Sequence, residues 1–83
     1  MKEVTYTPAA LKALTRMPAK TAAKVRSKIM AYAADPASQA NNVVKLQARE
    51  GLIRLRVGGY RVIMRDGLVL LVIEVATRGS VDY

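Results

Sequence analysis

Two short strand-like segments joined by a pair of glycines constrain the fold of this chain more than any other feature. Residues 52–57 and 60–65 are rich in branched apolar residues and flank Gly58-Gly59. A glycine pair between two such segments is typical of a β-hairpin with a two-residue turn. A turn of that length fixes the register, so Val57 is expected to pair with Tyr60.

The same register brings arginines together on one face of the hairpin. Arg56 is expected opposite Arg61, and Arg54 opposite Ile63, because side chains alternate between the two faces of each strand. Like charges placed opposite one another destabilise a sheet by roughly 0.2–1 kcal/mol. A fold that keeps Arg54, Arg56 and Arg61 side by side is therefore expected to use them to bind an anion.

Composition limits the classes of function. The 83 residues are enough for one domain, residues 1–83, and the 52% hydrophobic content predicts a folded chain. The net charge of +8 predicts an anionic partner such as nucleic acid or an acidic protein. The absence of Cys and His excludes disulfides, Cys/His zinc sites and thiol or Ser-His nucleophiles. The six scattered acidic residues predict neither a metal site nor a cofactor.

The N-terminal half is expected to form a strand and a helical hairpin. Residues 2–7 alternate like a strand, and Thr7-Pro8 is typical of a helix start, with a helix extending to about Met17. A second helix is expected over residues 19–34, with a basic stripe at i, i+4 and i+8 formed by Lys20, Lys24 and Lys28. No signal peptide or long apolar segment is visible, which favours a cytoplasmic protein without a membrane contact.

The C-terminal half is expected to complete a meander. Residues 35–42 have loop composition, and residues 43–46 are ambiguous between strand and connection. Asp66-Gly67 predicts a second two-residue turn, followed by a strand over residues 68–75. That turn pairs Arg65 with Leu68, Ile63 with Leu70 and Arg61 with Val72. The core face would then carry Tyr60, Val62, Met64, Val69, Leu71, Ile73 and Val75.

The predicted register leaves Leu70 and Val72 on the arginine-bearing face, together with Arg65 and Glu74. Apolar residues on a solvated face suggest that a partner segment or the C-terminal tail covers part of it.

The order of elements and one motif resemble the RelE/ParE superfamily of toxins from bacterial type II toxin–antitoxin modules. The motif is the segment Leu55–Ile63 (LRVGGYRVI), followed by Val75–Gly79 (VATRG). The resemblance covers the whole chain. It implies a small α+β domain, in which an N-terminal strand and a helical hairpin precede a three-stranded antiparallel meander.

RelE-type members of this superfamily cleave mRNA in the ribosomal decoding site without a metal. The resemblance implies catalytic roles for Arg54, Arg56, Arg61 and Arg78, which match the family's basic positions, and for Tyr83 as the terminal tyrosine in acid–base chemistry. Under this interpretation Lys20, Lys24, Lys28 and Arg65 would contact RNA or the ribosome. The expected function is a toxin that acts as a ribosome-dependent endoribonuclease and inhibits translation.

Two departures from the RelE pattern keep alternatives open. Leu52 stands where the best-known pattern has a lysine, and Asp82 stands where a tyrosine is common, one place before Tyr83. ParE-type relatives inhibit DNA gyrase, and a non-catalytic member would act only in antitoxin binding and operator repression. In each case the expected partner is an acidic antitoxin, and operator DNA would be contacted only through the antitoxin complex.

Overall fold

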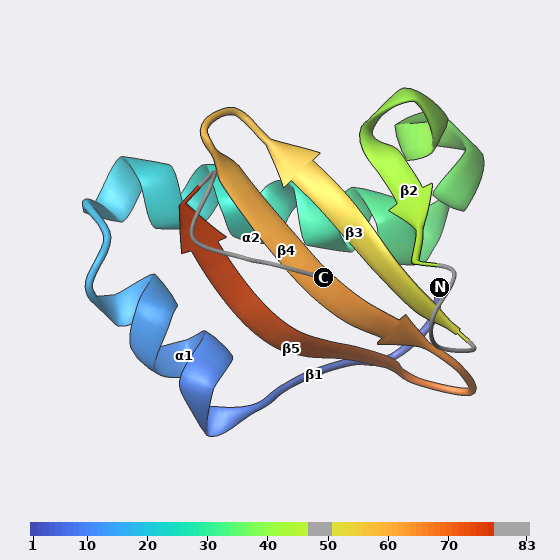
Figure 1. Ribbon diagram of the computed structural model, residues 1–83, viewed down its shortest axis with the longest axis horizontal. Helices are drawn as coiled ribbons and strands as arrows, with labels where there is room; N and C mark the ends of the chain where they lie inside the picture. The colour runs from blue at the N-terminus through green and yellow to red at the C-terminus, as the bar shows by residue number, and fades with distance from the viewer. Residues whose placement is uncertain (47–50, 78–83) are drawn as a thin grey trace.

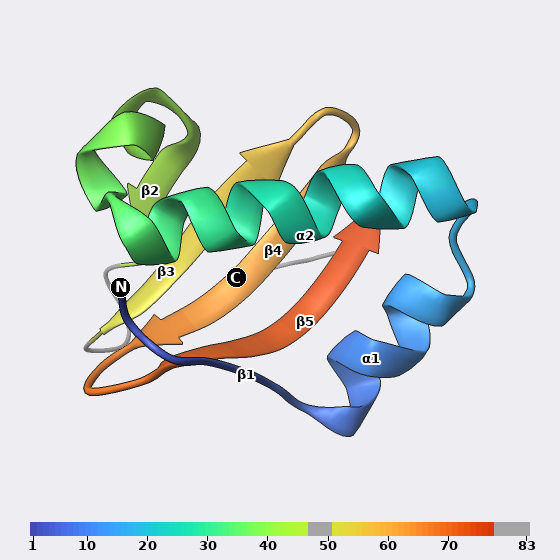
Figure 2. The same ribbon diagram turned by 180° about the vertical axis from the view of Figure 1, so that it is seen from behind.

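The computed structural model describes residues 1–46 and 51–77, which form an α+β domain of two layers (Figure 1). Two α-helices lie on one side of a twisted sheet, and the view from behind shows the longer helix crossing the strands (Figure 2). The elements in chain order are β1 (Val4–Tyr6), α1 (Pro8–Thr15), α2 (Ala19–Ala34), the 3-10 segment η1 (Pro36–Asn42), β2 (Val43–Lys45), β3 (Leu52–Val57), β4 (Tyr60–Asp66) and β5 (Leu70–Thr77). The fold class predicted from the sequence is confirmed.

The predicted meander β3–β4–β5 is extended at both edges. The described part of the chain forms one sheet with the strand order β1-β5-β4-β3-β2. The residues left ambiguous, 43–46, supply β2, which runs antiparallel to β3. β1 pairs parallel to β5, so the first strand of the chain closes the opposite edge. Both edge strands have three residues, which limits the unpaired backbone available for edge-to-edge association.

The two helices begin and end close to where the sequence places them. The Thr7 hydroxyl accepts a hydrogen bond from the Ala10 amide at 3.1 Å, and Pro8 occupies the first helical position. The same hydroxyl donates to the carbonyl of Ile73 at 2.6 Å, which ties the start of α1 to β5. Residues 36–42, expected to be a loop, instead form the 3-10 turns of η1 and bury the side chain of Gln39.

The first hairpin has the predicted register. Val57 pairs with Tyr60, and Arg56 pairs with Arg61. Gly58 has a φ of 57°, a left-handed conformation that glycine adopts without steric cost. This turn therefore places the arginines on a common face, as the glycine pair indicated.

The register predicted for the second hairpin is wrong. Arg65 pairs with Leu71 rather than Leu68, and Ile63 and Arg61 pair with Glu74 and Ala76. Residues 67–69 connect β4 to β5 in place of a two-residue turn, and the Gly67 amide donates to the Val69 carbonyl at 3.1 Å. An irregularity between Ile63 and Met64 then shifts the pairing once more. Such a bulge inserts one extra residue into a strand. The side chains of β5 before the bulge and after it therefore alternate between the two faces of the sheet in opposite phase.

This register reverses the predicted faces of residues 69–73, whereas Glu74 and Val75 lie on the faces predicted for them. Leu70 and Val72 are fully buried in the core beneath the helices, whereas Val69 is 41% exposed. Leu71 is only half-buried, and Ile73 packs on the other side of the sheet. The main core otherwise contains the predicted strand positions Val62, Met64 and Val75, together with Leu14, Val25, Ile29 and Leu55.

A polar contact beside the β4–β5 connection joins three separate parts of the chain. The Tyr32 hydroxyl donates a hydrogen bond to Asp66 Oδ2 at 2.6 Å, and the Lys2 ammonium forms an ion pair with Asp66 Oδ1. Burial raises the pKa of Tyr32, and the hydrogen bond to Asp66 adds to this, so that the pKa is about 12. Burial opposes the charge on Asp66, but the hydrogen bonds from Lys2 and Tyr32 outweigh it and lower the pKa of Asp66.

These shifts predict a loss of stability at both ends of the pH range. Tyr32 stabilises the fold below pH 10, and this contribution is lost as the pH rises toward 12, because the unfolded state ionises first. Asp66 contributes above its ordinary pKa of 3.8, and its contribution is lost as the pH falls through the lowered folded value. We expect the free energy of unfolding, measured in urea, to fall between pH 10 and 12 by up to about 2–3 kcal/mol more in wild type than in Tyr32→Phe. Equal losses in the two proteins would show that Tyr32 does not carry the effect.

No helix among residues 1–46 and 51–77 is long and apolar enough to cross a membrane.

Candidate functional site

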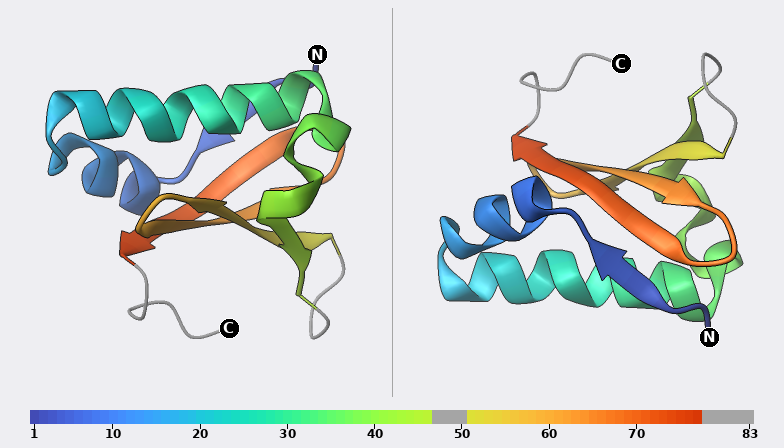
Figure 3. Two further views of the ribbon diagram at one scale, coloured as in Figure 1. Left: turned by 90° about the horizontal axis from the view of Figure 1, so that it is seen from above. Right: turned by 90° about the horizontal axis from the view of Figure 1, so that it is seen from below.

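The sheet face opposite the helices carries the arginines, and we call it the open face. α1 and α2 both pack on the other side of the sheet (Figure 3). The register places on the open face the side chains of Leu52, Arg54, Arg56, Arg61, Ile63, Arg65, Glu74 and Ala76. The arginine face predicted from the first hairpin is therefore confirmed for β3 and β4.

A small cavity on the open face brings three arginines together, and we call it the arginine cavity. Its volume is about 130 Å³, and its lining consists of Asn41, Asn42, Val44, Arg54, Arg56 and Arg61. The end of η1, β2, β3 and β4 each contribute to it. The cavity therefore depends on the sheet register and on the chain that enters β2.

The arginines reach the cavity from adjacent strands. Arg56 lies directly opposite Arg61, and Arg54 lies between Val44 and Ile63 on its two neighbouring strands. Arg54 and Arg61 are half-buried, while Arg56 is exposed. Because guanidinium groups stay charged at all working pH values and donate paired hydrogen bonds, this arrangement suits an anion with several oxygens, such as a phosphate.

Two asparagines of this cavity were missed by the sequence analysis. Asn41 and Asn42 end η1, in a segment interpreted only as a loop. The Asn42 amide donates a hydrogen bond to Gln39 Oε1 at 3.5 Å, and Gln39 is 7% exposed. Amide groups donate to phosphate or sugar oxygens without adding charge. One sequence signal could have identified them. The two asparagines directly precede β2, which pairs with the arginine-bearing strand β3.

An apolar strip lies beside the arginines on the open face. Leu52 is 3% exposed and Ile63 is fully buried, and the residues packed against them are Leu46, Ile73 and Ala76. The prediction that apolar side chains accompany the arginines holds, but the residues were wrong. Leu70 and Val72 belong to the core under the helices, because the second hairpin has a different register.

The other predicted site residues that the structure describes do not line the arginine cavity. Arg65 is exposed on the open face, four residues along β4 from Arg61, and pairs with Leu52 and Leu71. The stripe on α2 lies on the helix side of the sheet, with Lys20 and Lys24 exposed and Lys28 half-buried. Arg78 and Tyr83 lie outside the described residues.

The acidic residues of the described ranges do not cluster into a metal site. No group of three or more Asp or Glu side chains lies close enough together within residues 1–46 and 51–77 to hold an ion. The guanidinium and amide donors that line the arginine cavity can support electrostatic stabilisation and positioning of an anion.

A family model identifies the class of protein to which this chain belongs. The model of the family described as the ParE toxin of the type II toxin–antitoxin system, parDE, matches residues 4–81, nearly the whole chain. The chain therefore belongs to this family and is a toxin of a type II toxin–antitoxin system, within the RelE/ParE superfamily that the hairpin motif indicated.

Solved structures of RelE proteins share the fold. RelE in the archaeal RelE–RelB complex from Pyrococcus horikoshii OT3 is 23% identical, with a TM-score of 0.80, over 96% of this chain and 98% of that chain. The isolated E. coli RelE toxin is 17% identical, with a TM-score of 0.79, over 99% of this chain and 89% of that chain. RelE of the RelB–RelE complex from Methanococcus jannaschii is 18% identical, with a TM-score of 0.72, over 90% and 91% of the two chains. No curated protein sequence matches the chain.

Proposed function

We propose that this toxin binds the RNA backbone in the arginine cavity and cleaves mRNA on the ribosome, thereby inhibiting translation. The observation that supports the proposal best is the convergence of Arg54, Arg56 and Arg61 with two asparagine amides on one cavity. A net charge of +8 on 83 residues adds a long-range attraction for RNA. The likeness of the fold to RelE toxins agrees with the proposal.

The cleavage that such a site can support uses the RNA as its own nucleophile. The ribose 2′-oxygen forms a bond to the adjacent phosphorus and loses its proton, while the bond from phosphorus to the 5′-oxygen breaks and that oxygen gains a proton. The products are a 2′,3′-cyclic phosphate and a 5′-hydroxyl. Negative charge on the phosphoryl oxygens peaks in the transition state, where Arg54, Arg56 and Arg61 would stabilise it.

Arginine is unsuited to the two proton transfers, because it stays protonated at all working pH values. Tyr83 is our candidate for one of them, and Arg78 is the candidate for a fourth contact to the phosphate. Both assignments rest on the resemblance of the C-terminal motif. Tyr83→Phe, which retains the ring and removes the phenolic proton, tests the proton transfer separately from phosphate binding.

We further propose an acidic antitoxin as the partner that neutralises this toxin in the cytoplasm. Four of the similar solved structures are toxin–antitoxin complexes of the RelE–RelB type. The surface of this chain combines positive charge with large exposed apolar side chains on both helices, Leu11 at 43% and Met30 at 39%. Charge complementarity would speed association, and buried apolar contacts would hold the complex. Operator DNA would be contacted only through this complex.

Inhibition of DNA gyrase is the second candidate function. It is favoured by the match to the family model of ParE toxins, which covers residues 4–81. In that case the arginine cavity would contact an acidic protein surface, and the toxin would not cleave RNA.

One pair of assays separates the two candidates. The purified chain is added to translating ribosomes, with primer extension on the mRNA, and to a gyrase supercoiling reaction. We expect new mRNA ends that depend on ribosomes, and supercoiling at the rate without toxin. Intact mRNA together with blocked supercoiling would contradict the proposed endonuclease and establish the second candidate.

A further inference from the structure

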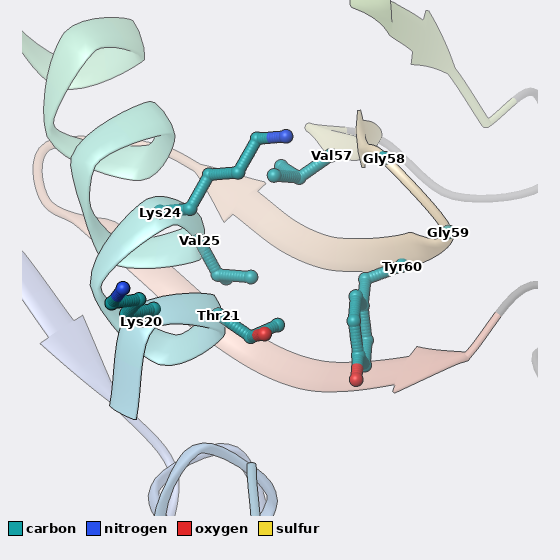
Figure 4. A pocket seen from close by; sticks show the side chains of 8 residues that line it. All are labelled: Lys20, Thr21, Lys24, Val25, Val57, Gly58, Gly59 and Tyr60. Carbon is teal, nitrogen blue, oxygen red and sulfur yellow. The ribbon is translucent and has the colours of Figure 1, made fainter. Parts of the chain in front are cut away.

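A second cavity lies on the helix side of the sheet, between the start of α2 and the β3–β4 turn, and we call it the helix-side pocket. Its volume is about 260 Å³, and its lining consists of Lys20, Thr21, Lys24, Val25, Val57, Gly58, Gly59 and Tyr60. Figure 4 shows Thr21 and Val25 directed from α2 toward the ring of Tyr60. Ligand pockets for drug-sized molecules are about 300–1,000 Å³, so this pocket suits a smaller group.

The pocket has an apolar interior and a cationic rim. Val25 and Val57 are buried and belong to the core. Tyr60, predicted to be a core residue, is half-buried instead and forms one wall. The ammonium group of Lys24 lies beside the turn. Its Nζ atom would be 3.9 Å from a Cβ added at Gly58. Lys20, one helical turn before Lys24, adds a second exposed cation at the rim.

The glycine turn leaves the outer side of this pocket open. A Cβ added at Gly59 would meet no atom within 4 Å, so the space beside the turn is free. The turn also lies between the two cavities. Val57 and Tyr60 face the helix-side pocket, while the neighbouring pair Arg56 and Arg61 faces the arginine cavity. A flexible strand that passes the tip of the hairpin would contact both.

We propose that the helix-side pocket binds one nucleotide of single-stranded RNA, with the base stacked on Tyr60 and the phosphate held by Lys24 and Lys20. An aromatic wall, an apolar interior and ammonium groups at the rim are the combination that binds unpaired bases without sequence preference. A bare anion would leave the apolar interior and the ring without a contact. The proposal rests on the proposed RNA-cleaving function and adds to it a second RNA contact beyond the arginine cavity.

Binding of AMP to the full-length chain tests this proposal without requiring cleavage. The amide signals of Thr21 and Val25 in two-dimensional NMR spectra report on this pocket, because both residues line it and neither lines the arginine cavity. We expect AMP to shift these signals saturably, and ribose 5-phosphate, which lacks the base, to bind at least about fivefold more weakly, the lower limit of the effect of one stacked base. Equal affinities for the two would overturn base stacking, and the absence of a saturable shift would overturn the site.

Matched variants assign the contact to the named side chains. Lys24→Gln and Tyr60→Leu are expected to weaken AMP binding at least about fivefold, Tyr60→Phe to retain it, and Lys12→Gln, an exposed lysine of α1, to leave it unchanged. If Tyr60→Leu unfolds, the comparison of Lys24→Gln with Lys12→Gln decides, and equal effects of the two lysines would overturn the proposal. AMP binding by the wild-type chain without mRNA cleavage would leave the pocket in place while the proposed function fails.

Discussion

Replacing Arg61 with alanine is expected to slow single-turnover cleavage of mRNA on programmed ribosomes by about 10²–10³-fold, the usual effect of removing one donor to a developing oxyanion. Arg61 is half-buried, lines the arginine cavity and lies opposite Arg56, so a phosphate bound in the cavity would be within its reach. Ribosome binding should change much less, because the remaining basic residues share the electrostatic attraction.

Arg16→Ala is the matched control for this prediction. Arg16 is an exposed arginine at the end of α1 and belongs to neither cavity. Its loss should weaken ribosome binding slightly and in a salt-dependent way, while the cleavage rate of the bound complex stays the same. If Arg61→Ala and Arg16→Ala affect the bound rate alike, the arginines of the open face provide only attraction, and no active site lies there.

The substitution Leu70→Lys is expected to unfold the protein, whereas Leu68→Lys should change the free energy of unfolding by less than about 0.5 kcal/mol. Leu70 is fully buried beneath the helices and pairs with Val4, while Leu68 is completely exposed in the connection between β4 and β5. Burying an unpaired ammonium costs several kcal/mol, a large part of the stability of a domain of this size. Far-UV circular dichroism and urea unfolding of the two variants measure the difference.

This pair also tests the register of the second hairpin. The register expected from a two-residue Asp66-Gly67 turn would place Leu70 on the open face, where a lysine would be tolerated. A folded Leu70→Lys protein with an unfolded Leu68→Lys protein would contradict the pairing of Asp66 with Leu70.

The first hairpin could be predicted because its signals are local. Gly58-Gly59 defines the turn, and the alternation of arginine with apolar residues in β3 defines the faces. The second hairpin offered no such alternation. Residues 68–73 are uniformly apolar, so a register with either face inward satisfies the pattern equally well, and a bulge leaves no mark in such a run.

The candidate site was predicted in part for the same reason. Arg54, Arg56 and Arg61 follow from the first hairpin alone. The position of Asn41 and Asn42 in the site depends on the pairing of β2 with β3. This long-range pairing could not be predicted from a strand of three residues. The half-buried position of Tyr60 depends on how α2 crosses the hairpin, which is likewise set by tertiary packing. Helix limits, in contrast, follow from Thr7, Pro8 and Pro18, whose effects are local.

The most direct test of the central claim, that Arg61 contacts the phosphate at which the RNA is cut, is a thio-substitution measured with and without Arg61. A sulfur replaces one non-bridging oxygen of the phosphate at the cleavage position, and single-turnover rates are measured on programmed ribosomes for wild type and Arg61→Ala. Sulfur accepts hydrogen bonds weakly, so the substitution should slow wild type. Because groups in direct contact have non-additive effects, the same sulfur should slow Arg61→Ala little or not at all for one of the two phosphate stereoisomers. Equal slowing of the two proteins by both stereoisomers would contradict a direct contact between Arg61 and the phosphate.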